Sequence, residues 1–155
     1  MPRHSELGPT RVILIRHAQK TGIPGDRDLS ELGIQRAKAL LSNVTRRVEK
    51  IVTIIAAKSS RKSRRPRLTV EPFAEALGTA IEESWDTEDY QALASHLLHS
   101  GHYQGKAVLI CWRHDTLQDL AQALGAGQAP SWGPDLYDRI WLLDMTEPKL
   151  QFEEA

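Results

Sequence analysis

The chain has 155 residues, of which 41% are hydrophobic and 26% are charged, and its 20 basic residues balance 20 acidic ones. This length and composition predict a single globular domain over residues 1–155, with a core at about residues 11–145. The zero net charge gives no signal for binding nucleic acid or a membrane. The single cysteine excludes an internal disulfide framework, and the apolar run at residues 12–15 is too short for a signal peptide or a membrane span. We therefore expect a cytoplasmic protein.

Apolar runs alternate with amphipathic segments along the first third of the chain. After a loose lead-in over residues 1–10, a run rich in Val and Ile predicts a strand at residues 11–15. Glycines and a proline predict a loop at residues 21–28. Ser30 is a suitable N-cap for a helix that reaches about residue 42 and continues, as helix or as turn, towards residue 50. A second apolar run predicts a strand at residues 51–56.

The same alternation continues to the end of the chain. It predicts helices at residues 69–77 (closed by Gly78 and weakened by Pro72), 88–100 and 117–124. It predicts strands at residues 79–81, 106–112 and 139–143, a loop at 127–134, and a frayed polar tail from residue 147. Strands that alternate with helices predict the α/β class, as a three-layer α/β/α sandwich with a mostly parallel central sheet.

Two of the predicted strands end in an Arg-His pair, Arg16-His17 and Arg113-His114, and a basic stretch at residues 58–67 follows a third strand. Because the carboxyl ends of parallel strands meet at one edge of a sheet, we expect these side chains to lie close together. Guanidinium groups match phosphate oxygens, and a histidine can attack phosphorus as a nucleophile. Each feature alone also has a structural interpretation, as a satisfied strand-end histidine or a solvated basic loop. Their coincidence favours a site for a phosphate ester.

Two other groups suggest competing chemistry. His96, His99 and His102 have a spacing that permits metal binding, but Gly101 is expected to end the helix before His102, so a polar helix end is preferred. Cys111 suggests a cysteine phosphatase, which needs an arginine six residues later, where this chain has leucine. We therefore interpret Cys111 as a buried strand residue.

Several segments, taken in order, resemble the histidine phosphatase superfamily, the phosphoglycerate-mutase-like group, and especially its short phosphohistidine-phosphatase-like members. The stretch Arg16-His17-Ala18-Gln19-Lys20 resembles the opening motif of that group. Residues 28–37 resemble its first helix entry, and residues 108–115 resemble its second histidine strand. In residues 63–72, the spacing of an arginine four residues before a threonine selects Arg65 with Thr69. The similarity extends from about residue 11 to residue 143.

The resemblance implies a phosphatase that acts on phosphomonoesters or on protein phosphohistidine. It implies that His17 is the nucleophile, which becomes phosphohistidine, and that Arg16, Arg65 and His114 bind the phosphoryl oxygens. It implies that neither a metal nor another cofactor is needed. It also implies a carboxylate that acts as general acid after the middle helix; Glu83 and Asp86 are the leading candidates, and the spacing does not choose between them.

Three residues depart from the pattern of that group, and other functions stay open. Lys20 replaces a common Thr or Ser and adds a cation near the entrance, Trp112 is either core or pocket lining, and Arg113 is either a fourth phosphate ligand or a surface residue. The alternatives to a phosphatase are a non-catalytic phosphate- or partner-binding module of the same fold and, less favoured in so short a chain, a phosphomutase. We expect a monomer or weak dimer that binds neither nucleic acid nor membrane.

Overall fold

The computed structural model describes residues 7–48, 50–127, 129–145 and 151–154. Its strands are β1 (Arg11–Arg16), β2 (Ile51–Ala56), β3 (Ile81–Glu82), β4 (Ala107–Trp112), β5 (Trp141–Asp144) and β6 (Gln151–Glu154). Its helices are α1 (Glu31–Thr45), α2 (Arg65–Leu77), α3 (Tyr90–His99) and α4 (His114–Ala123). The elements come close to the predicted order of strands and helices.

The strands form one sheet with the order β3-β2-β4-β1-β5-β6. The first four of these are mutually parallel; at the far edge β5 is antiparallel to β1, and β6 is antiparallel to β5. Strand β1 pairs with β4 along its whole length, from Arg11 opposite Ala107 to Arg16 opposite Trp112. The prediction of a mostly parallel central sheet is therefore confirmed.

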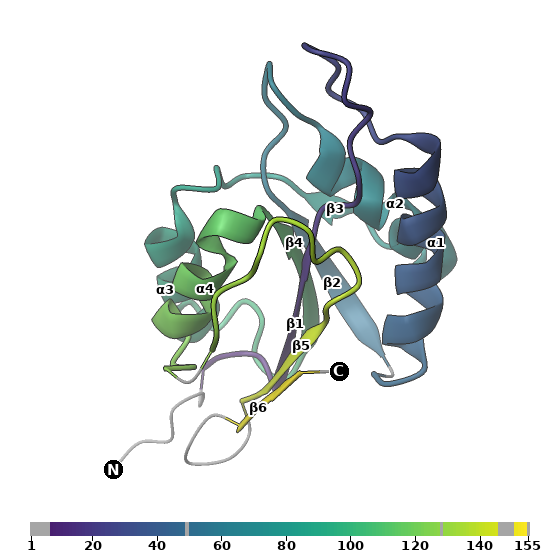
Figure 1. The fold of residues 1–155 in the computed structure, drawn as a ribbon. Coiled ribbons are helices and arrows are strands. Elements are labelled where there is room, and N and C mark those ends of the chain that lie inside the picture. The colour runs from purple at the N-terminus through teal and green to yellow at the C-terminus, as the bar shows by residue number, and fades with distance from the viewer. Residues whose placement is uncertain (1–6, 49, 128, 146–150, 155) are drawn as a thin grey trace.

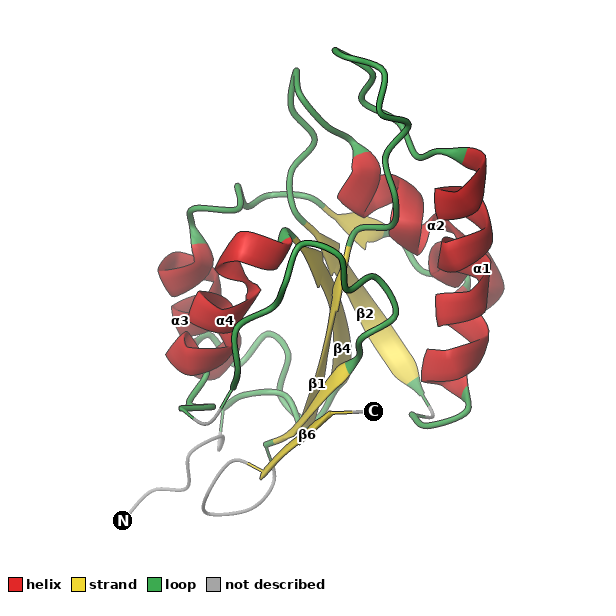
Figure 2. Cartoon of the chain, in the orientation of Figure 1, coloured by secondary structure: helices red, strands yellow, loops and turns green. Residues whose placement is uncertain are grey.

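Helices cover both faces of this sheet, with α1 and α2 on one side and α3 and α4 on the other (Figures 1 and 2). Successive side chains of a strand point to opposite faces, so the apolar run of β1 contributes to both cores. Val12 and Leu14 belong to the core beneath α3 and α4, whereas Ile13 and Ile15 belong to the core beneath α1 and α2. This two-sided burial explains why the strand is continuously apolar, and it confirms the predicted three-layer sandwich.

Two helices begin earlier than predicted. Helix α2 begins at Arg65 and not at residue 69, and Pro66 lies in its first turn, where a proline is well accommodated. Pro72 is accommodated inside this helix. Helix α4 begins at His114 and not at residue 117. Arg65 and His114 are therefore the first residues of helices that follow parallel strands, so both lie at the carboxyl edge of the sheet.

The ends of the chain differ from the prediction or lie outside the description. Residues 151–154 form β6, which pairs with β5, so the expectation of a frayed tail is wrong for these four residues. Residues 146–150 and 155 of that tail, and residues 1–6 of the predicted lead-in, lie outside the described residues. Within the described residues, no helix has the length and apolar character needed to cross a membrane.

Candidate active site

The four predicted site residues lie at the carboxyl edge of the parallel strands. Arg16 ends β1 directly beside the end of β4, and the His17 N–H donates to the carbonyl of Trp112 (3.2 Å). His114 follows β4, and Arg65 begins the helix that follows the loop after β2. The charges of Arg16, Arg65 and His114 all act on the His17 imidazole. The topology thus brings together three segments that are far apart in the sequence.

The His17 ring is buried and held by the backbone. His17 is only 8% exposed, and its Nδ1 lies 2.8 Å from the carbonyl oxygen of Ala18. Because a carbonyl only accepts hydrogen bonds, Nδ1 carries the hydrogen. In the neutral ring, Nε2 therefore keeps its lone pair, which is the form that a nucleophilic histidine requires.

Burial lowers the pKa of His17 from its ordinary value of 6.5 to about 4. The hydrogen bond to Ala18 opposes this change, and the positive charges of Arg16, Arg65 and His114 reinforce it. Neighbouring arginines alone favour the neutral imidazole by charge repulsion, but burial is the larger cause in the structure. At neutral pH the imidazole is consequently unprotonated.

Arg16 is fixed by the segment that connects α4 to β5. The residue is 2% exposed, its Nη1 donates to the carbonyl of Pro134 (2.5 Å), and its guanidinium carbon lies 3.9 Å from the centre of the Tyr137 ring. A guanidinium over an aromatic face is attracted by the ring quadrupole, which holds the cation in one plane. Tyr137 also acts electrostatically on Arg65. Sequence analysis missed Tyr137, because nothing in its local pattern marks it.

Hydrogen bonds of the Thr69 hydroxyl explain why a threonine stands four residues after Arg65. Its hydroxyl oxygen accepts from the Ala18 N–H (2.8 Å), and the hydroxyl donates to the Arg65 carbonyl (2.8 Å). One buried threonine therefore ties the residue after His17 to the first turn of α2. The Arg65 side chain is held in addition by a hydrogen bond from Nη1 to the Asp26 carbonyl (2.9 Å). We identify Thr69 as a positioning residue for this site.

Three of the four residues carry a buried nitrogen that lacks a partner. Within the described residues, Nε of Arg16, Nε of Arg65 and Nδ1 of His114 are buried without a hydrogen bond. A buried polar group without a partner costs about 1–3 kcal/mol, and such groups are rare in native structures. A phosphoryl group brings several strong acceptor oxygens. The arrangement is therefore suited to an oxyanion held next to His17.

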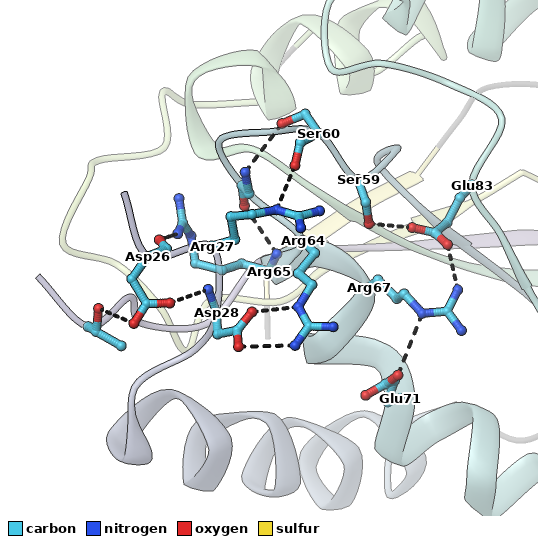
Figure 3. Close-up of polar contacts among 12 residues, drawn as sticks. Asp26, Arg27, Asp28, Ser59, Ser60, Arg64, Arg65, Arg67, Glu71 and Glu83 are labelled. Carbon is cyan, nitrogen blue, oxygen red and sulfur yellow. Dashed lines mark hydrogen bonds and ion pairs between the residues drawn. The ribbon is translucent and has the colours of Figure 1, made fainter. Parts of the chain in front are cut away.

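The two candidates for the general acid have different surroundings. Burial raises the pKa of Glu83, but hydrogen bonds from Ser59 (2.7 Å) and Arg67 (2.5 Å) outweigh it, so the pKa lies below its ordinary value (Figure 3). Glu83 is therefore ionised at neutral pH, and an ionised carboxylate has no proton to donate. Asp86 is exposed in the segment before α3. The contacts of Glu83 are therefore those of a carboxylate in an ion pair with Arg67.

The structure also places the residues whose roles the sequence left open. Trp112 is fully buried and its indole N–H donates to the Thr87 carbonyl (3.1 Å), which makes it a core residue. The Arg113 side chain is 41% exposed and pairs with Glu88 and Asp115. Neither residue therefore takes the pocket role that was one of its two predicted alternatives.

The competing groups have structural surroundings. Cys111 is fully buried in β4, and burial raises the pKa of its thiol, in keeping with a strand residue of the core. His96 packs against the rings of Trp85 and Tyr103. No set of three or more His, Cys, Asp or Glu side chains that could hold a metal ion occurs among the described residues. His96 and His102 thus belong to an aromatic cluster with Trp85 and Tyr103.

A mostly parallel sheet that carries two Arg-His pairs at one edge defines an α/β protein with a buried, cationic site around a neutral histidine. No protein-family model matches the sequence, and no curated protein matches it. Solved structures do resemble the fold. A protein from Agrobacterium tumefaciens assigned as the phosphohistidine phosphatase SixA is 20% identical, with a TM-score of 0.64 over 94% of this chain and 97% of that one.

Two further structures show the same likeness. The protein histidine phosphatase SixA complexed with tungstate is 16% identical, with a TM-score of 0.64 over 94% of this chain and 96% of that one. A mycobacterial glucosyl-3-phosphoglycerate phosphatase with inorganic phosphate is 16% identical, with a TM-score of 0.57 over 94% of this chain and 95% of that one. At these identities the likeness is one of fold, and it confirms the histidine phosphatase fold that the sequence resemblance implied.

Proposed function

We propose that this chain is a histidine phosphatase that hydrolyses phosphomonoesters or protein phosphohistidine through a phosphohistidine intermediate on His17. The observation that carries the proposal is a neutral, backbone-oriented imidazole among Arg16, Arg65 and His114, each of which has one buried nitrogen without a hydrogen bond in the described part of the chain. The tungstate and phosphate bound in the two solved structures of this fold lend support, because both are oxyanions of the size of a phosphoryl group.

The first step is attack of the His17 Nε2 lone pair on phosphorus. The bond from phosphorus to the leaving oxygen or nitrogen breaks, and its electron pair departs with the leaving group. Arg16, Arg65 and His114 contact the phosphoryl oxygens, where fixed donors stabilise the charge of the transition state. A water molecule then attacks phosphorus, the phosphorus–nitrogen bond breaks, and Nε2 recovers its lone pair as phosphate leaves. Guanidinium groups supply the positive charge in this scheme, so it requires no metal.

The surroundings of Glu83 bear on which substrates suit the site. With Glu83 ionised and paired to Arg67, it supplies no proton to a departing alkoxide. Leaving groups that carry negative charge easily, or that depart as a neutral imidazole, do not need that proton. We therefore propose phosphohistidine and aryl phosphates as better substrates than alkyl phosphates.

Hydrolysis of p-nitrophenyl phosphate by the wild type and by His17→Ala tests the proposal. We expect phosphate release by the wild type, its loss in His17→Ala, and its persistence after treatment with EDTA. Mass spectrometry of acid-free quenched samples should find phosphate on the peptide that contains His17. His99→Ala, which removes an exposed histidine of α3, is the matched control and should retain activity. A binding module without activity would bind phosphate yet release none from any ester between acid and neutral pH.

A further inference from the structure

A second pocket lies next to the proposed phosphoryl site and shares a residue with it. This pocket of about 320 Å³ is formed by the loop after β1 and the loop after β2, and its lining includes Lys20, Asp26, Lys62 and Arg65. The turn at residues 22–25 forms one of its walls. Arg65 lines this pocket and also lies near His17. A molecule that extends from the His17 site into the pocket would therefore pass the Arg65 guanidinium.

The two loops that form this pocket are joined by hydrogen bonds. Arg27 Nε donates to the Ser60 carbonyl (2.9 Å), and the Arg64 N–H donates to the Arg27 carbonyl (3.1 Å). The Arg64 guanidinium also binds both carboxylate oxygens of Asp28, at 2.5 and 3.0 Å (Figure 3). A bridge between residues 20 and 29 closes the base of the first loop. The pocket walls are thus held in place by contacts between the loops.

The charges around the pocket are unbalanced. The neighbouring Arg64 and Arg67 are each neutralised by an acid, whereas the ammonium groups of Lys20 and Lys62 have neither an ion pair nor a hydrogen bond within the described residues. Asp26 is the one acidic residue in the lining, and its two carboxylate oxygens already accept from the Thr21 hydroxyl (3.0 Å) and the Asp28 N–H (2.9 Å). The pocket is therefore lined by the unpaired ammonium groups of Lys20 and Lys62 and by the Arg65 guanidinium. Its one carboxylate, that of Asp26, already accepts two hydrogen bonds.

We propose that this pocket binds a second acidic group of the substrate, a carboxylate or a second phosphate, while the first phosphoryl group occupies the site around His17. The inference rests on the proposed phosphatase function and narrows its substrate to small phosphomonoesters that carry another anion. Lys20 and Lys62 are exposed residues that line a hollow of about 320 Å³, and a hollow of this size fits one small acidic group. Direct contact between an ammonium and an anionic group is stronger than a neutral hydrogen bond.

The test compares phenyl phosphate with the three isomeric carboxyphenyl phosphates. For each enzyme, the ratio of kcat/KM for the best carboxyphenyl ester to kcat/KM for phenyl phosphate measures the preference for the second acid. We expect Lys20→Met and Lys62→Met each to lower this ratio by about fivefold, and the double variant by more, in line with a partly exposed charged contact. Lys62→Arg should keep most of it. Differences between leaving groups cancel, because the same ratio is compared between enzymes.

Arg61→Met is the matched control, because Arg61 is an exposed cation of the same loop outside the pocket lining. An equal fall of the ratio in Arg61→Met would assign the preference to general charge and overturn the subsite. Hydrolysis of all esters with no preference for the carboxylate would also overturn it, while leaving the phosphatase intact. Hydrolysis of none would refute the proposed function itself. If the lysine variants affected only phosphohistidine peptides with acidic neighbours, the second anion would belong to a protein, and the small-substrate assignment would be wrong.

Discussion

Acidification should destabilise this protein specifically through His17. Burial holds the pKa of His17 at about 4 in the folded chain, whereas an exposed histidine has a pKa of 6.5. Above pH 6.5 the imidazole is neutral in both states and has no effect. As the pH falls from 6.5 towards 4, the unfolded chain takes up a proton that the folded chain refuses. The free energy of unfolding must therefore fall over this window and level off below pH 4.

The size of the effect follows from the separation of the two pKa values. The linkage amounts to about 2 kcal/mol lost at pH 5 and about 3 kcal/mol lost at pH 4, relative to pH 7. A globular domain has only about 5–15 kcal/mol of stability in total, so a loss of this size is measurable. His17→Gln removes the titrating group and keeps a polar side chain of similar reach.

Urea unfolding of the wild type and of His17→Gln at pH 7, 6, 5 and 4 provides the assay. The difference between the two proteins isolates His17, because all other groups, including His114, titrate in both. We expect the wild type to lose about 3 kcal/mol against the variant by pH 4. His99→Gln, which alters an exposed histidine, should run parallel to the wild type. If the difference in free energy of unfolding between the wild type and His17→Gln stayed constant from pH 7 to pH 4, a buried, neutral His17 would be refuted.

Substitutions at three further positions test other contacts. Gly33→Ala should destabilise the fold by about 1–3 kcal/mol in urea unfolding, since its Cβ would lie 2.2 Å from the Gln19 carbonyl oxygen; unchanged stability would show that the two segments separate easily. Tyr137→Leu should raise KM for phenyl phosphate by about fivefold and Tyr137→Phe by less, because phenylalanine keeps the ring that stacks on Arg16 and loses only the hydroxyl; equal effects would contradict this. Glu83→Gln should lower kcat for phenyl phosphate by less than about tenfold, whereas loss of a general acid costs about a hundredfold or more.

The sequence was informative wherever function and fold depend on local pattern. Continuous apolar runs marked β1 and β4 as strands buried on both faces, and the Arg-His pairs directly after these runs were predicted to meet. Among the six basic residues at 58–67, local pattern alone did not distinguish one from another; only the resemblance selected Arg65. The distinction is tertiary, because Arg64 and Arg67 are neutralised by Asp28 and Glu83 from distant segments.

Other features depend on contacts that no local pattern records. Tyr137 reaches Arg16 only because β5 adds to the sheet beside β1 and returns the chain across the site. The start of α2 at Arg65 makes this residue the first of a helix, where the sequence predicted a loop. Strand β6 is short and polar, and it exists because β5 offers an edge for pairing.

The reason why His17 is neutral bears on how the proposed site divides two tasks, which are keeping the nucleophile unprotonated and binding the phosphoryl group. If repulsion by the arginines were the main cause, the same residues would both prepare the nucleophile and bind the anion. In the structure, burial at the end of β1 is the larger cause, and the arginine charges add to it. In the proposed mechanism, the sheet edge therefore prepares the nucleophile, while Arg16, Arg65 and His114 remain available to bind an incoming phosphoryl group. Since binding that anion offsets their charges, a nucleophile kept neutral by burial stays reactive when the substrate arrives.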